Sequence, residues 1–283
     1  MVQTKTQQTT SAQKMMIFVL TMSLYGLATL FSELIPEFHV GIVELSVEYF
    51  LFIPLTLGIL FDPLSAALGA ATGELIFSEI MLGQFGGLGE LEKFLTLTIA
   101  LYIAGRMVKD PKNIKMVGFA SILSVIIQQA MSCTVDILKV QFAVEDFEAV
   151  AGLPESVFLT EGFSFLNDVL FSGILFCLLP TLYLVPRLYG KIEPLLGLKP
   201  RDEHTVLGND KVLTPKVVLL SIIGFAVSIA AEFLSESDLS LIDWEAEWAE
   251  SSNAIIISIA AAVVVAIILI AVMRKKALDS KND

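Results

Sequence analysis

An uncharged and almost wholly apolar run, NAIIISIAAAVVVAIILIAVM, occupies residues 253–273 of this chain. A helix of that length crosses the ~30 Å hydrocarbon core of a bilayer. The rest of the chain has a similar character, with 55% hydrophobic residues, 17% charged residues and a mean hydropathy of +0.77. Lipid offers the backbone no hydrogen-bond partners, so long apolar segments are expected to be helices. The sequence therefore predicts an all-α polytopic membrane protein.

Eight apolar segments are long enough to be considered as spans. They cover about residues 15–35, 46–61, 63–82, 93–107, 116–138, 164–186, 215–235 and 253–273. When their directions alternate, 16 of the 18 Lys and Arg residues fall on one face, and only Lys93 and Lys139 fall on the other. The positive-inside rule makes the first face cytoplasmic, so we expect both termini in the cytoplasm.

The acidic residues are distributed in the opposite way. The net charge is -12, yet only eight of the 30 Asp and Glu residues fall on the predicted cytoplasmic face. A negative outer vestibule would attract cations and repel anions. The alternative interpretation is an acid-rich surface that serves solubility. Neither pattern indicates binding to nucleic acid.

Loops divide the chain into three predicted parts. A six-span body, residues 1–192, is followed by a cytoplasmic linker, 193–214, that contains Pro, Gly and mixed charges. A two-helix extension, 215–283, completes the chain. On the outer side, the loop 83–92 is rich in glycine, which permits backbone conformations that other residues avoid.

Polar side chains inside the spans are the candidates for a ligand site, because ionisable groups are costly in hydrocarbon. The span acids all lie in the outer half or at the outer boundary. This position favours one outward-open cavity over a proton path that crosses the membrane. The predicted substrate-binding residues are Glu33, Glu48, Glu74, Gln128, Gln129, Asp136, Asn167 and Asp168. For Gln128 and Gln129 the alternative is hydrogen bonding between helices.

Two acids of the third predicted span compete for the same site. Glu74 and Glu79 are five residues apart, which is about 140° around an α-helix. They cannot face one pocket unless the helix is interrupted, so we prefer the deeper Glu74 and interpret Glu79 and Glu232 as solvated span ends. Asp136 has an ordinary alternative role, a local pair with Lys139 one turn later.

Small residues recur on the third span, where Ala66, Ala70 and Gly73 share spacings of three or four. Small residues allow helix backbones to approach closely. Internal packing is the stronger interpretation, and docking to a partner subunit is the alternative.

A family resemblance appears at residues 53–74, IPLTLGILFDPLSAALGAATGE. This stretch resembles the substrate-binding S components of energy-coupling-factor (ECF) transporters, which import vitamins and metals. Here Asp62 replaces the usual turn glycine, and Glu74 replaces the usual aspartate. Asn167 and Asp168 at the start of the sixth span are also similar, and the likeness covers about residues 12–192. The first span lacks the Ala-x-x-x-Ala repeat of many S components, and the last two spans exceed the usual six.

The resemblance implies a function in the prokaryotic cytoplasmic membrane. A small molecule would be captured outside, with loops 83–92 and 140–163 as gates, and released inside when the body reorients. The chain has no Walker A sequence, so the energy would come from a separate coupling membrane subunit and ATPase subunits. Glu74, Asp136 and Asp168 would favour a cationic or donor-rich micronutrient.

Two other function classes remain open. A self-contained ion-coupled carrier would use the same carboxylates and need no ATPase. A membrane enzyme or assembly factor is disfavoured, because the only histidines, His39 and His204, lie outside the spans. Cys133 and Cys177 lie in separate spans and give no Cys-pair motif. We therefore expect no catalytic residue, metal or cofactor.

Overall fold

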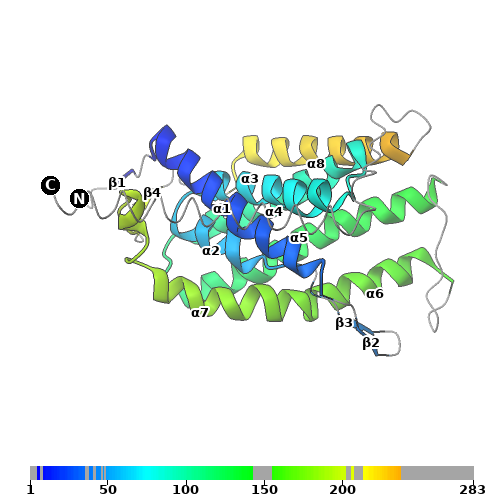
Figure 1. The fold of residues 1–283 in the computed structure, drawn as a ribbon, viewed down its shortest axis with the longest axis horizontal. Helices are drawn as coiled ribbons and strands as arrows, with labels where there is room; N and C mark the ends of the chain where they lie inside the picture. Colours follow the sequence, from blue (N-terminus) through cyan, green and yellow to red (C-terminus); the bar gives the residue numbers. More distant parts are fainter. Residues whose placement is uncertain are drawn as a thin grey trace.

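The computed structural model describes residues 5–6, 9–35, 38–40, 43–45, 47, 49–142, 155–201, 205–206 and 213–236. These residues form a bundle of helices, most of which run along the long axis of the molecule (Figure 1). The α-helices are α1 (Ser11–Ser32), α2 (Phe52–Leu60), α3 (Pro63–Glu74), α4 (Glu90–Met107), α5 (Ile114–Gln141), α6 (Val157–Leu170), α7 (Leu179–Leu188) and α8 (Pro215–Glu236).

Short segments of other types connect these helices. Two are π-helices, η1 (Leu75–Ile80) and η3 (Ile174–Leu178), and two are 3-10 turns, η2 (Gly87–Gly89) and η4 (Glu193–Leu196). Strand β1 (Lys5–Thr6) pairs in parallel with β4 (Thr205–Val206), and β2 (Phe38–Val40) pairs antiparallel with β3 (Val43–Leu45).

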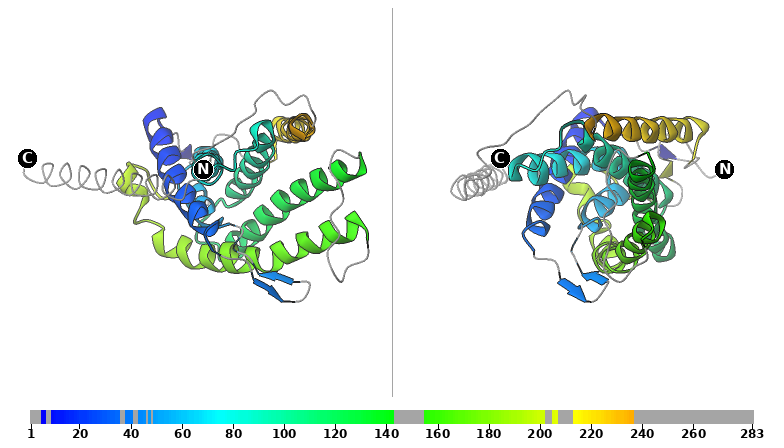
Figure 2. Two further views of the ribbon diagram at one scale, coloured as in Figure 1. Left: turned by 45° about the vertical axis from the view of Figure 1, so that its right-hand side comes forward. Right: turned by 90° about the vertical axis from the view of Figure 1, so that its right-hand side faces the viewer.

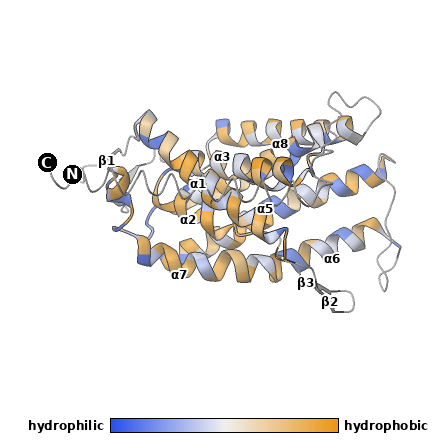
Figure 3. Ribbon diagram, in the orientation of Figure 1, coloured by the Kyte–Doolittle hydropathy of each residue, from blue (hydrophilic) through white to orange (hydrophobic). Residues whose placement is uncertain are grey.

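Four helical stretches are long and apolar enough to cross a membrane. They are α1, α5, the continuous run Val157–Leu188 through α6, η3 and α7, and α8 up to Ser235. They carry exposed apolar side chains, for example Leu219 and Leu220 on α8. Much of the ribbon of these helices has the colour of hydrophobic residues (Figure 3). The predicted helical architecture is thus confirmed, with four candidate membrane spans in the described part of the chain, whereas the count of eight spans stays a prediction. Helix α2 has nine residues, or about 13 Å, so the predicted span 46–61 contains only a short helix. The predicted span 253–273 lies outside the described residues.

Basic residues gather where the helices end. The bases predicted to be cytoplasmic include Lys14, Arg106, Lys115, Arg187 and Lys216, at the start of α1, the end of α4, the start of α5, the end of α7 and the start of α8. The start of α1, the end of α7 and the start of α8 lie toward the same end of the bundle (Figure 1). Lys93 and Lys139 belong instead to the start of α4 and the end of α5. Which end faces the cytoplasm stays a prediction.

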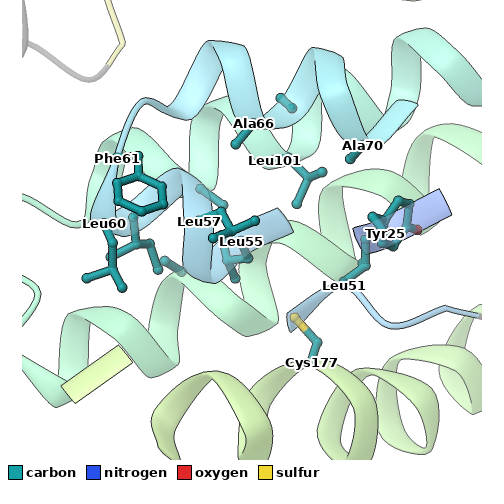
Figure 4. Packing of buried hydrophobic residues seen from close by; sticks show 14 of the residues in the cluster. Tyr25, Leu51, Leu55, Leu57, Leu60, Phe61, Ala66, Ala70, Leu101 and Cys177 are labelled. Atoms are coloured by element: carbon teal, nitrogen blue, oxygen red, sulfur yellow. The ribbon is translucent and has the colours of Figure 1, made fainter. Parts of the chain in front are cut away.

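Helix α2 forms the centre of the core, although it is the shortest of the helices that line it. The other helices surround α2 in the view along the long axis (Figure 2, right). Leu55, Ile59 and Leu60 are at most 1% exposed. Figure 4 shows α2 side chains packed with Ala66 and Ala70 of α3 and Leu101 of α4. This packing fixes the helices that carry the polar site.

Helices α1 and α3 cross in close contact because glycine lies at the crossing. A Cβ at Gly73 would overlap the backbone oxygen of Met22, and a Cβ at Gly69 would overlap that of Phe18. Ala66 and Ala70 are 1% and 0% exposed. The small residues of this span therefore pack inside the chain, and the structure leaves Ala66, Ala70 and Gly73 no surface for a partner subunit.

The turn between α2 and α3 is fixed by Asp62. Its carboxylate Oδ2 accepts hydrogen bonds from the backbone N of Ser65 at 2.9 Å and from the Ser65 hydroxyl at 2.7 Å. Asp62 is therefore an N-cap, and Pro63 occupies the first turn, where no backbone donor is needed. These contacts explain how an aspartate serves at this turn position.

A buried arginine closes the same end of the bundle. Arg201 is 0% exposed, and its Nη2 donates to the backbone oxygen of Gly58 at 3.0 Å, near the C-terminal end of α2. A cation is favourable there because of the helix dipole. Burial lowers the pKa of the Arg201 guanidinium to about 10, and the nearby Asp62 and Glu193 carboxylates oppose this shift. Glu193 is also 0% exposed, so two opposite charges are buried together.

Candidate functional site

The third predicted span changes helix type immediately after Glu74. Residues Leu75–Ile80 form a π-helix, in which each backbone hydrogen bond spans five residues instead of four. Residues five apart then lie on nearly the same face. Glu74 and Glu79 consequently line one pocket, the arrangement that a regular α-helix forbids.

That pocket is enclosed by α3, η1 and the first turn of α4. Ala71, Glu74, Leu75, Glu79, Glu90, Lys93 and Phe94 line it, and its empty volume, including the part open to solvent, is about 180 Å³. Lys93 Nζ lies 3.1 Å from Glu79 Oε1 and 3.5 Å from Glu90 Oε2. The side chains of Glu79 and Glu90 are 8% and 7% exposed, whereas that of Lys93 is 52% exposed.

Glu74 is the carboxylate that this lysine does not neutralise by direct contact. Its Oε2 atom is fully buried and has no hydrogen-bond partner among the described residues. The pocket thus holds three carboxyl groups and one ammonium group. A buried carboxylate oxygen without a partner is unfavourable, so the group either holds a proton there or meets a cation or a hydrogen-bond donor.

A line of buried polar groups continues from Glu74 into the bundle. Tyr25 on α1 is 0% exposed and lies within electrostatic range of both Glu74 and Tyr49. Tyr49 in turn accepts a hydrogen bond from Gln129 Nε2 of α5 at 3.1 Å. Figure 4 shows the Tyr25 ring beside Leu51 in the core. Four segments that are distant in the sequence therefore bring their polar side chains into one row.

A second charged cluster lies on the other side of α4. Lys139 Nζ is 3.2 Å from Asp136 Oδ1 and 3.2 Å from Glu232 Oε1 of α8, and its side chain is only 12% exposed. Glu92 is 6% exposed and interacts electrostatically with Asp136 and Glu232. The predicted local pair of Asp136 and Lys139 is confirmed, and it is extended by an acid from α8.

The predicted site residues differ in their relation to the pocket. Glu74 lines the pocket, Glu33 is near enough to influence it electrostatically, and Gln129 reaches it through Tyr49 and Tyr25. The pocket lining does not include Asp136, Gln128, Asn167 or Asp168; Asn167 and Asp168 lie on α6, which packs against α5. Glu48 lies outside the described residues.

Several site residues were not singled out from the sequence. Glu79 and Glu232 were interpreted as solvated, yet their side chains are only 8% and 15% exposed. Glu90 and Lys93 were not among the predicted site residues. A pattern that could have indicated them is the run of acidic and basic residues at the start of a helix, directly after a glycine-rich loop. Tyr49 gave no signal, because its partner Gln129 is 80 positions away.

Within the described part of the chain, no group of three or more His, Cys, Asp or Glu side chains is arranged to hold a metal ion. The pocket carboxylates instead share Lys93, which occupies the position that a cation would take between Glu79 and Glu90.

Residues 16–282 match the family described as "Family of unknown function (DUF8171)". The chain belongs to this family. The match runs through α8 and beyond it, so the segment after residue 192 is part of the family's common sequence. No curated protein and no solved structure matches the chain.

Proposed function

We propose that this chain is the membrane substrate-binding subunit of an ATP-driven, ECF-type importer. It would capture a small cationic or donor-rich micronutrient from outside the prokaryotic cytoplasmic membrane. The proposal rests mainly on one observation, the buried Oε2 atom of Glu74 that has no hydrogen-bond partner and borders a pocket. A donor group on the ligand would meet this oxygen.

The charges around the pocket support a cationic ligand over an anionic one. Glu79 and Glu90 already share Lys93, so the carboxyl group of Glu74 is left to interact with a ligand. The surroundings are otherwise apolar, with Ala71, Leu75 and Phe94 in the wall. These apolar walls would contact the non-polar part of a ligand, and the carboxyl groups would orient its donors.

Access from outside is supported by the charge pattern along the sequence. The pocket residue Lys93 and the cluster residue Lys139 are the two bases that the positive-inside rule leaves on the outer face. With both termini cytoplasmic, the pocket would open outward and the buried Arg201 would lie at the inner end. Separate coupling and ATPase subunits would then drive release, as the likeness to S components at residues 53–74 implies.

One observation favours a second candidate, a self-contained ion-coupled carrier. Glu92 has a buried Oε1 atom without a hydrogen-bond partner in the described structure, and it lies on the other side of α4 from Glu74. Two such carboxylates would allow a solute at one and a coupling ion at the other. This carrier would transport its solute in liposomes without any ATPase.

Native mass spectrometry of the purified chain tests the first proposal. A retained small molecule is expected in the parent, and its occupancy should fall in Glu74→Gln. Removal of a hydrogen bond to a charged group costs about 1.5–3 kcal/mol, which weakens binding roughly 10- to 100-fold. Glu155→Gln, the same change at an exposed position before α6, is the matched control and should retain the ligand. Equal occupancy in Glu74→Gln and the parent would exclude this site.

Co-purification then separates the two candidates. An importer subunit should recover a coupling membrane protein and ATPase subunits when it is extracted from its native membrane in mild detergent. A carrier should instead show gradient-driven uptake of the identified molecule by the purified chain alone.

A further inference from the structure

Helix α8 contacts the loop of residues 83–89, which leads directly into Glu90, a wall residue of the pocket at the start of α4. It packs along α4 and over η2, at the end of the bundle where α5 ends and α6 begins (Figure 1). This helix belongs to the segment that exceeds the six spans of S components. Its contacts with the body therefore have no counterpart in a six-span S component.

Gly86 joins the pocket to α8 through its own backbone. Its N–H donates to Glu90 Oε1 at 3.1 Å, and its carbonyl oxygen accepts a hydrogen bond from the Ser235 hydroxyl at 2.8 Å. Glu90 is a wall of the pocket and contacts Lys93. Gly86 thus links Ser235 of α8 to the carboxylate of Glu90 through two hydrogen bonds.

Glu232, one turn before Ser235, makes the second connection. Its Oε1 atom contacts Lys139 of α5, which anchors this end of α8 to the bundle. Its Oε2 atom lies close to Gly89, where an added Cβ would be 2.8 Å away, and the same Cβ would be 3.2 Å from Ser235 Oγ. Ser235 therefore holds the loop at Gly86 by a hydrogen bond, and the Glu232 side chain packs against the loop at Gly89.

The loop itself depends on glycine to follow this path. Gly83 and Gly87 have φ values of 75° and 71°, a backbone region that other residues rarely adopt. Gly86 itself has no side chain, and its backbone is bonded to Glu90 on one side and to Ser235 of α8 on the other.

We infer that α8 is the retaining element of the pocket wall: Ser235 and Glu232 hold the loop at residues 86–89 and, through Gly86, the carboxylate of Glu90, and release of these contacts admits the ligand to Glu74. This inference deepens the proposed function, on which its ligand rests. It assigns Glu232 and Ser235 as positioning residues, since they act through Gly86 and Glu90. It also gives the first helix after the linker a defined role.

Accessibility of the pocket tests this without any ligand. Ala71 lines the pocket and is 1% exposed, so Ala71→Cys reports on access while leaving every pocket charge in place. The background carries Cys133→Ser and Cys177→Ala, and the probe is a membrane-impermeant cationic methanethiosulfonate. In Glu232→Gln/Ser235→Ala we expect labelling about tenfold faster, because an ion pair and a hydrogen bond are lost.

The matched control is Ser228→Ala on the same helix. Ser228 is 0% exposed and its hydroxyl bonds to Phe225 O within α8, so its removal changes the helix without touching the loop. Labelling should stay at the parent rate. An equal labelling rate in Glu232→Gln/Ser235→Ala and the parent would overturn the inference.

A reversible crosslink removes the concern that a variant is misfolded. The Cβ of Gly89→Cys would lie within about 4 Å of the position 235 side chain, which is within disulfide reach. In Gly89→Cys/Ser235→Cys, without the native cysteines, oxidation should slow hydrogen exchange of the residue 83–88 amides, and reduction should restore it. Identical exchange in the two states of this one protein would also overturn the inference.

Failure of this inference and failure of the proposed function would be distinguishable. Neither accessibility nor exchange uses Glu74 or a bound molecule. If no ligand is found by mass spectrometry but labelling accelerates as expected, α8 still retains the loop, and only the capture function is lost.

Discussion

The crossing of α1 and α3 gives the sharpest stability prediction, because backbone meets backbone there. In Gly69→Ala the new Cβ would overlap Phe18 O and lie 3.1 Å from Phe18 C and 3.2 Å from Met22 N. No side chain can rotate away from this contact, so α1 must shift as a unit. Overpacking of this kind costs about 3 kcal/mol at the upper end. The better helix propensity of alanine returns about 1 kcal/mol. The net loss of unfolding free energy should be about 2 kcal/mol.

The measurement is denaturation by dodecyl sulfate in mixed micelles, followed by circular dichroism at 222 nm. Gly162→Ala in α6 is the matched control, since a Cβ at this position meets nothing within 4 Å. It should leave stability unchanged or raise it by up to about 1 kcal/mol. If Gly69→Ala proves as stable as Gly162→Ala, the close crossing of α1 and α3 described above is refuted.

Two further changes, at Asp62 and at Arg201, test the end of the bundle where α2 meets α3, with the same assay. Asp62→Ala should cost about 1 kcal/mol, since the N-cap of α3 loses its contacts with Ser65, and Asp62→Asn should restore most of it; equal stability of all three proteins would argue against the cap. Arg201→Met should cost about 3–5 kcal/mol because the buried Glu193 loses its nearby cation. Adding Glu193→Gln should recover part of that loss, and purely additive effects would contradict an interaction between the two charges.

The sequence predicted those features that depend on local chain geometry. The helices of the described region overlap the predicted apolar segments, although α6 begins at Val157, inside the predicted outer loop 140–163, and four helical stretches instead of eight are long and apolar enough to span. Asp136 pairs with Lys139 because residues three apart meet on one helix face. Internal packing by the small residues of α3 was also anticipated, since close approach of backbones needs only the absence of side chains.

The site depended on features that local patterns do not encode. The π-helix at Leu75–Ile80 changes which residues share a face, and this segment packs against α1, which is remote in the sequence. Glu92 and Lys93 are neighbours in sequence, yet they serve different clusters because successive helical residues point about 100° apart. The contact between Gln129 and Tyr49 joins remote segments and required the tertiary fold.

The widened turn after Glu74 makes the alignment of two acids a matter of chain length. A π-turn arises when one extra residue is accommodated without breaking the helix. Loss of any one residue between positions 75 and 78 would leave the two acids four apart, and a regular α-helix would then hold them on one face, about 40° from each other. Family members with a one-residue gap here would therefore keep both carboxylates in one pocket without a widened turn. Members that keep all the residues need the π-turn, so the gap and the turn should replace each other among the relatives that share this pocket.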